Sequence, residues 1–307
     1  MTADALERLT VVAAGFHTLV VDRGRPRTRS LGVPVGGAAD RRALALGNAL
    51  VDNDADAASL EINLAGPTLR SSGRVAAVVF GAPFRLTSDR QLLTAGTTFT
   101  LEAGETLHVH GTADGMRAYL CVRGGLRTPL VLGSRSALAP LADGDELLCI
   151  TGAIKPRFLR RQFVGDDEPH LLHALDGAQS DWFRLDELYG PEFRVGTESN
   201  RMGLRLAGTP LTVPGREMIS EPVCPGTVQV TREGRCIVLG VDGQTIGGYP
   251  KIAQVVAADL DKLAQLRPGA AVRFRRVGPD EAEALYRARR EELHEWLTRL
   301  RTAAWSD

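Results

Sequence analysis

Three glycine-bearing stretches carry the polar side chains that could bind or convert a small molecule: residues 32–40 (GVPVGGAAD), 198–203 (ESNRMG) and 242–250 (DGQTIGGYP). Glycine permits positive φ and lets the backbone approach a ligand closely. The carboxylate, hydroxyl, amide and guanidinium groups beside the glycines supply donors and acceptors. Each stretch alone is also typical of an exposed turn. The third is longer and more polar than a hairpin turn needs, and we expect it to line a binding site.

The motifs of the commonest nucleotide and hydrolase sites are absent from the sequence. It contains no G-x-x-x-x-G-K-[ST] phosphate loop and no G-x-S-x-G nucleophile elbow. His108 and His110 alternate in a strand-like run, so both rings would lie on one face. The sequence places no third ligand beside them, and we therefore predict no metal site.

Composition and charge restrict the class of protein. The 307 residues are 44% hydrophobic and carry a formal net charge of zero, which argues against nucleic acid or an anionic membrane as the partner. Residues 23–29 (RGRPRTR) are a local exception, read either as a solvated loop or as an anion site. No apolar run approaches the roughly 18 residues of a membrane span, and the first residues lack the pattern of a secretory signal.

The four cysteines form no C-x-x-C pair, and three of them lie in apolar strand-like runs: Cys121, Cys149 and Cys236, with Cys224 outside such a run. Free thiols are the expected state of such cysteines. We expect a cytoplasmic protein.

Strand patterns dominate the chain. Residues 10–22 are β-rich with a break at Gly15, and shorter strand-like runs follow at 75–84, 97–101, 106–110 and 116–122. The caps and apolar spacing predict helices over 40–53, 259–266 and 279–300.

The two halves resemble each other weakly. Each has a buried strand, a glycine-bearing loop and a later L-x-x-G-x-x strand entry, which predicts two similar β-barrels joined near residues 155–167. The expected organisation is a first domain over 1–155, a second over 156–278, and a C-terminal helix and tail over 279–307.

Six longer motifs occur in order across nearly the whole chain: GVPVGGAADRRALALGNALVDN, SLEINLAGPTLR, AYLCVRGGL, LVLGSRS, SNRMGLRLAGTPL and DGQTIGGYPKIAQVVAADLDKLAQLRPG. Together they resemble the carboxyltransferase/allophanate hydrolase subunit 2 family. Members of that family include the C subunit of 5-oxoprolinases and the carboxyltransferase part of urea carboxylase. The resemblance implies a mainly β fold of two tandem cyclophilin-like β-barrel domains with few helices.

The resemblance further implies the C subunit of an ATP-dependent 5-oxoprolinase-type complex, which opens 5-oxoproline, a lactam, to L-glutamate. Its partners would be proteins similar to the A and B subunits of 5-oxoprolinases. ATP with Mg²⁺ would act through the complex, and no biotin would be attached to this chain.

Matching the family motifs position by position implies a set of site residues. The match assigns acid/base or metal-nucleotide roles to Glu61, Glu221 and Asp242. It assigns binding of an anionic group to Arg135 and Arg201. The backbone of Gly247 and Gly248 would donate to an oxyanion. The remaining substrate-binding positions are Asp40, Asn48, Ser199, Asn200, Ser220, Gln229, Gln244, Thr245 and Tyr249.

The chain departs from the family pattern at two motifs. Residues 34–40 read PVGGAAD where P-x-S-G-A-M-D is usual, and Gly243 and Ile246 replace an arginine and a threonine of D-R-Q-T-T-G-G-Y. Two alternatives therefore stay open beside the 5-oxoprolinase function. One is a biotin-dependent carboxyltransferase acting on urea or a related small amide, and the other is a non-catalytic regulatory partner of a homologue of the B subunit.

Overall fold

The computed structural model describes residues 5–160 and 170–302 and divides into two compact units. The first unit comprises Met1–Gly24, Arg41–Phe163 and Leu293–Asp307, and the second comprises Arg25–Asp40 and Val164–Glu292. The glycine-bearing stretch at 32–40 thus clusters with the second unit. The sequence places the junction between the two domains near residues 155–167. Residues 161–167 of this junction lie outside the described residues.

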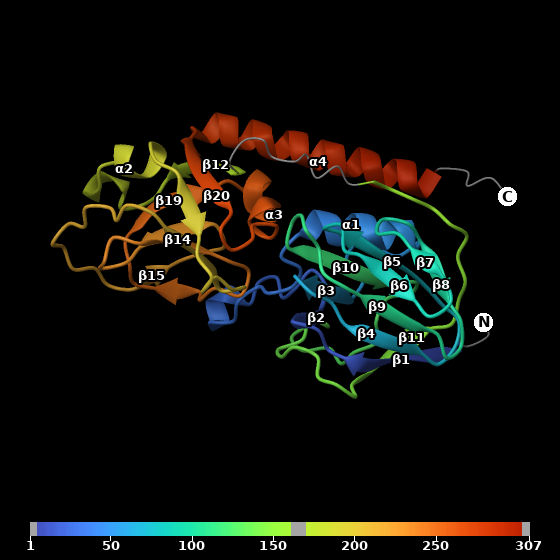
Figure 1. Cartoon of the computed structure of the whole chain (residues 1–307). Helices are drawn as coiled ribbons and strands as arrows, with labels where there is room; N and C mark the ends of the chain where they lie inside the picture. The colour runs from blue at the N-terminus through green and yellow to red at the C-terminus, as the bar shows by residue number, and fades with distance from the viewer. Residues whose placement is uncertain (1–4, 161–169, 303–307) are drawn as a thin grey trace. The chain divides into compact units, whose positions relative to one another are not determined.

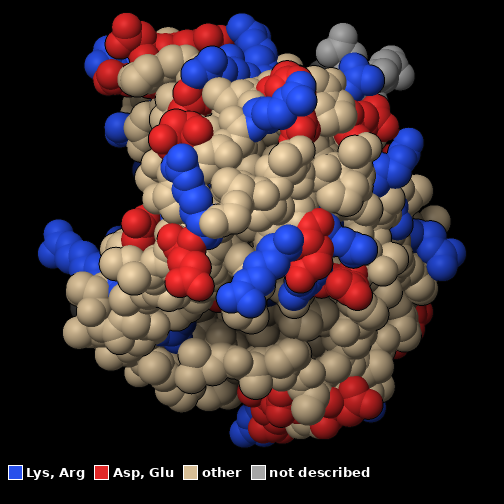
Figure 2. All heavy atoms as spheres, turned by 90° about the vertical axis from the view of Figure 1, so that its left-hand side faces the viewer, with Lys and Arg blue, Asp and Glu red and all other residues tan. Residues whose placement is uncertain are grey.

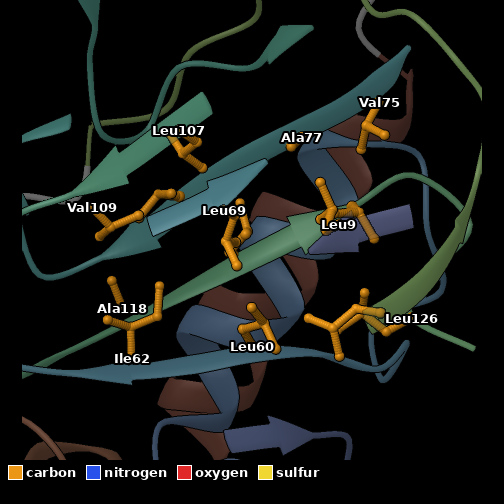
Figure 3. Close-up of a cluster of buried hydrophobic side chains, with 14 of the residues drawn as sticks. Leu9, Leu60, Ile62, Leu69, Val75, Ala77, Leu107, Val109, Ala118 and Leu126 are labelled. Atoms are coloured by element: carbon orange, nitrogen blue, oxygen red, sulfur yellow. The ribbon is translucent and has the colours of Figure 1, made fainter. Parts of the chain in front are cut away.

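Two sheets surround one core in the first unit (Figure 1). One sheet has the order β11 (Glu146–Ile150), β1 (Leu6–Ala13), β4 (Thr68–Ser71), β9 (Thr106–Val109), β6 (Leu86–Ser88) and β7 (Leu92–Leu93). The other has the order β2 (His17–Val21), β3 (Ser59–Asn63), β10 (Arg117–Val122), β5 (Val75–Gly81) and β8 (Phe99–Leu101). Leu9, Leu60, Leu69 and Leu107 from both sheets meet in this core (Figure 3).

Glycines make the corner where the chain passes from one sheet to the other. Gly15 has a φ of 75° and separates β1 from β2, as the sequence predicts. A Cβ at Gly15 would lie 2.5 Å from the backbone of Gly66, which separates β3 from β4. Only glycine tolerates both this φ and this approach, so the chain can bend sharply here.

Helix α1 (Arg41–Leu50) covers the face of β10 and β5 in the first unit (Figure 1). Gly47 allows the close approach, because a Cβ there would lie 2.8 Å from Cys121 Sγ.

The second unit is a closed barrel of seven strands. Their order is β12 (His170–Asp176), β19 (Lys251–Val255), β16 (Thr227–Val230), β17 (Cys236–Leu239), β14 (Gly203–Ala207), β13 (Phe193–Val195) and β20 (Ala271–Arg276). Parallel pairing of β12 with β20 closes the barrel. Outside it, β15 (Glu221–Pro222) and β18 (Ile246–Gly247) form a two-stranded ribbon.

The other helices are short, except the last. They are α2 (Asp186–Tyr189), α3 (Leu260–Leu263) and three 3-10 turns, η1 (Arg29–Leu31), η2 (Ser180–Trp182) and η3 (Ala257–Asp259). The last helix, α4 (Pro279–Thr302), starts at the predicted proline and ends two residues beyond the predicted end. These elements confirm the predicted fold class, which is mainly β with few helices and a C-terminal helix. Of the two predicted β-barrels, the second unit forms a closed barrel, and the strands of the first unit form two sheets around one core. Among the described residues, none of the helices combines the length and apolar character of a membrane span.

Basic and acidic side chains are interspersed on the surface seen in Figure 2, which views the molecule from the side where α2 and β15 lie. Near α2, Arg184 pairs with Asp186 at 3.0 Å and with Glu187 at 3.7 Å. This mixing agrees with the zero net charge.

Candidate functional site

The three glycine-bearing stretches of the sequence meet in the second unit around Arg201 and Asp242. Arg201 Nε donates to Asp242 Oδ2 at 2.6 Å, and Arg201 Nη2 donates to Asp242 Oδ1 at 3.0 Å and to the carbonyl oxygen of Gly37 at 2.6 Å. The Gly36 amide donates to the carbonyl of Val241 at 3.0 Å. A two-pronged guanidinium–carboxylate pair of this kind fixes both side chains.

A tight turn between β13 and β14 presents Arg201. Asn200 and Gly203 bridge across the turn, and Asn200 Oδ1 accepts from the Met202 amide at 2.9 Å. Ser199 Oγ accepts from the Arg205 amide at 3.0 Å. Ser199 and Asn200, both predicted to bind substrate, thus shape the turn that positions Arg201.

Positive φ values at Gly36 (61°) and Gly37 (74°) let the 32–40 segment approach this pair. A Cβ at Gly36 would lie 3.5 Å from Asp242 Oδ1 and 3.6 Å from Arg25 Nη1. Groups of opposite charge therefore flank the glycine. At the end of the segment, fully buried Asp40 accepts from Gln265 Nε2 at 2.8 Å.

A second polar cluster lies beneath the β15–β18 ribbon, on the outer face of the barrel. Val228 and Val230 belong to the barrel core, so alternation turns Gln229 outward. Gln229 is nevertheless only 1% exposed. Its Oε1 accepts from Gln244 Nε2 at 3.4 Å, so one loop, residues 242–250, contributes to both clusters.

An ion pair between Glu221 and Lys251 completes this second cluster. Glu221 Oε2 also accepts from Gln179 Nε2 at 3.2 Å, and Gln179 Oε1 accepts from the Lys251 amide at 3.1 Å. The ammonium of Lys251, followed by the Gln179 amide, holds the pKa of Glu221 below its ordinary value. Glu221 is therefore ionised at neutral pH and suits the role of acceptor better than that of proton donor.

Other residues predicted to bind substrate lie in or beside the loop of residues 242–250. Thr245 is buried, and its carbonyl accepts from the Val223 amide at 3.0 Å. A Cβ at Gly248 would lie 3.6 Å from Ser220 Oγ. Tyr249 has a φ of 136°, a strained value for a residue with a side chain.

Glu61 and Asn48, both predicted site residues, lie in the first unit with their polar groups engaged in internal contacts. Glu61 is fully buried, accepts from Tyr119 Oη at 2.8 Å and lies 3.4 Å from Arg117 Nε. Asn48 is also fully buried, and it donates to the carbonyl of Ala57 at 2.9 Å. These contacts favour structural roles for both residues.

The LGSRS motif of the first unit organises an aspartate that the sequence analysis did not single out. Asp22 accepts from Ser134 Oγ at 2.6 Å, from Ser136 Oγ at 2.7 Å and from the Arg135 amide at 2.7 Å. Burial raises the pKa of Asp22, but these hydrogen bonds and one from the Gly24 amide outweigh it, and the pKa lies below its ordinary value. The Arg135 guanidinium, predicted to bind an anion, donates to the carbonyl of Thr128.

His108 and His110 lie on one face as predicted, with ring centroids 6.2 Å apart. His110 Nε2 pairs with Thr87 Oγ1 at 2.8 Å. In the part of the chain that the structure describes, no group of three or more His, Cys, Asp or Glu side chains is placed to hold a metal ion.

Lys251 and Gln179 also belong to the site without having been predicted. The lysine follows the glycine-rich loop in the sequence, but its partner Glu221 is 30 residues away. Gln179 lies 72 residues from Lys251. Tertiary contacts between segments far apart in the sequence bring them together, although a lysine directly after a Gly-Gly-Tyr-Pro turn was a signal that could have been followed.

The fold and site define a two-unit β protein with a cluster of charged and amide side chains suited to a small polar ligand. The chain belongs to the family described as carboxyltransferase domain, subdomain A and B, whose model matches residues 31–276. It is 35% identical to the C subunit of 5-oxoprolinase from Escherichia coli over 297 residues, covering 89% of this chain and 93% of that protein.

Two solved structures share the fold. TTHA0988 superposes with a TM-score of 0.80 at 33% identity, covering 90% of this chain but 57% of that longer chain. The urea carboxylase of Kluyveromyces lactis superposes with a TM-score of 0.83 at 25% identity, covering 94% of this chain and 29% of that one.

Proposed function

We propose that this chain is the C subunit of an ATP-dependent 5-oxoprolinase-type complex that opens 5-oxoproline to L-glutamate. The observation that carries the proposal is the similarity to the C subunit of the Escherichia coli 5-oxoprolinase along nearly the whole of both chains, 89% and 93%. In the reaction, one water adds across the lactam C–N bond and a second is consumed as ATP is hydrolysed to ADP and phosphate.

The two polar clusters give the residues their proposed roles. Arg201, held by Asp242, lies in the cluster that would bind the anionic group of a substrate or nucleotide. Glu221 and Gln229 would contact the amide group of the lactam. The backbone of Gly247 and Gly248 would donate to the oxygen that becomes negative as the ring opens.

The proposed partners are proteins similar to the A and B subunits of 5-oxoprolinases. An exposed loop of the first unit supports association, because Leu130, Leu132 and Leu138 are 62%, 55% and 80% exposed. Large apolar side chains gathered on one loop mark protein–protein contacts. ATP with Mg²⁺ would bind only at the level of the complex, where the partners supply further phosphate contacts.

Reconstitution with the proteins of the neighbouring genes tests the proposal. The complex should release glutamate from 5-oxoproline only when ATP is present. Asp242→Asn should lower this rate at least about tenfold without changing complex assembly. Glu198→Gln, at an exposed residue of the turn that presents Arg201, is the matched control and should leave the rate unchanged. A complex that assembles and releases no glutamate would refute the assignment.

The similarity to urea carboxylase supports a second candidate. Here the chain would transfer a carboxyl group to urea or a related small amide from biotin carried by a partner. Carboxylation of urea by the chain with a biotinylated partner, without glutamate release from 5-oxoproline, would establish it. A third candidate, a regulatory partner of a homologue of the B subunit, predicts tight association without turnover.

A further inference from the structure

Gln229 carries a buried hydrogen-bond donor that the protein leaves unused. Its side chain is 1% exposed, and within the described residues its Nε2 has no hydrogen-bond partner. A buried amide donor without a partner is destabilising. Such a group in a polar cluster points to a ligand atom that accepts a hydrogen bond.

Glu221 carries the complementary acceptor. Its Oε2 is occupied by Lys251 and Gln179, and in the described part of the chain no hydrogen bond engages Oε1. The side chain is 37% exposed, so a ligand can reach it. Lys251 keeps the carboxylate charged and fixes its position, since the lysine side chain itself is only 11% exposed.

Strand pairing and the 242–250 loop bring the donor and the acceptor close to Gly247. Glu221 is the cross-strand partner of Gly247, and Gln229 is the cross-strand partner of Lys251. A Cβ at Gly247 would lie 3.6 Å from Gln229 Nε2 and 3.1 Å from Gln244 Nε2. A side chain at this position would therefore crowd the two amides, and glycine avoids that contact.

We infer that Gln229 and Glu221 form a subsite for the cis-amide edge of a lactam or cyclic urea, with Lys251 and Gln179 as positioning residues. In such a ring the N–H and the C=O point to the same side, so one donor and one acceptor can bind both at once. Gln229 Nε2 donates to the ring carbonyl, and Glu221 Oε1 accepts from the ring N–H. A trans amide points these groups in opposite directions and cannot make the pair. The inference rests on the proposed function only for the choice of 5-oxoproline as the natural lactam.

The test compares ligands that differ by one group. Binding of 2-pyrrolidone, N-methyl-2-pyrrolidone and 5-oxoproline to the full chain is measured by titration in ligand-observed NMR. The parent protein should bind 2-pyrrolidone about tenfold more tightly than the N-methyl compound, which lacks the N–H. This comparison needs no variant and is independent of any folding defect.

Variants then assign the two contacts. Gln229→Met should weaken both pyrrolidones about tenfold, whereas Glu221→Gln should weaken only the one that has an N–H. Lys251→Met should reduce the discrimination between the two compounds, which a merely structural role would not do. Glu217→Gln, exposed in the segment before β15, is the matched control for Glu221→Gln.

The outcomes separate this inference from the proposed function. Equal binding of the two pyrrolidones, no lactam binding, unchanged affinity for both compounds in Gln229→Met, or unchanged selectivity in Glu221→Gln would overturn the subsite. If the complex opens 5-oxoproline but these variants leave its KM unchanged, the subsite is refuted and the proposed function stands. If the chain binds lactams through these residues but the complex releases no glutamate, the subsite stands and the proposed function fails.

Discussion

Glu61→Gln distinguishes a structural from a chemical role for the buried carboxylate of the first unit. The substitution preserves the size of the side chain and removes its charge. Glu61 and Tyr119 are fully buried and Arg117 is 4% exposed, so the pair has little solvent to screen it. The variant leaves the Arg117 guanidinium buried without the charge of Glu61 opposite it.

The expected loss of stability follows from that burial. Removing one partner of a buried ion pair costs about 3–5 kcal/mol, a large share of the roughly 5–15 kcal/mol that stabilises a domain. For a unit of this size, each kcal/mol lowers the Tm by about 2–4 °C. Glu61→Gln should therefore lower the Tm of the first unit by about 6–20 °C. Tyr119→Phe removes one hydrogen bond to a charged group and should cost less, about 1.5–3 kcal/mol.

Thermal unfolding followed by circular dichroism measures these shifts, and glutamate release by the complex is measured in parallel below the transition. The control is Glu102→Gln, which breaks the exposed pair with Arg74 at 3.3 Å and should change stability by less than about 1 kcal/mol. If Glu61→Gln unfolds within about 2 °C of the parent but abolishes turnover, the carboxylate takes part in the chemistry and the structural reasoning is wrong.

The remaining predictions concern pH, thiol reactivity and ATP. Because the pKa of Asp22 is lowered in the folded protein, its contribution is present above a pH of about 4 and is lost as the pH falls through the folded value. Urea midpoints of Asp22→Asn and the parent should thus differ at neutral pH and converge as the pH falls below about 4. Burial raises the pKa of the Cys121 and Cys236 thiols to about 12 and that of Cys149 to about 11. Iodoacetamide at a pH of about 8 should therefore modify only exposed Cys224, and labelling of the other three in native protein, seen by peptide mass spectrometry, would contradict this. Under the proposed function the isolated chain should neither bind ATP appreciably nor hydrolyse it, whereas calorimetry giving micromolar affinity with turnover would count against that.

Local patterns in the sequence were sufficient for much of the fold. The break at Gly15 and the start of α4 at Pro279 both follow from the backbone preferences of single residues. The closure of the second barrel does not, because β12 and β20 pair in parallel although they lie far apart in the sequence. No short-range signal specifies such a pairing.

The candidate site, like the fold, could be predicted from the sequence only in part. Glycine and polar groups in the 242–250 loop predict a binding site, while the sequence leaves the loops at 32–40 and 198–203 open between a ligand site and an ordinary turn. The structure brings all three together. Glu61 looked equally promising in a family motif, yet burial beside Arg117 and Tyr119 gives it an internal role. Burial of this kind depends on tertiary packing, which the pattern of a single strand does not contain.

The departure at Gly243 shows how a loop and its neighbours adapt together. The family pattern has an arginine at this position, which suggests a lost functional group. In the structure a Cβ at Gly243 would lie 2.9 Å from the carbonyl oxygen of Met202 and 3.1 Å from that of Gly240. No longer side chain fits unless the turn that presents Arg201 shifts. The same tight contact lets the Asp242 amide donate to the carbonyl of Arg201 at 3.1 Å. The two loops can therefore pack this closely because residue 243 has no side chain. Their packing holds the Arg201 guanidinium against Asp242.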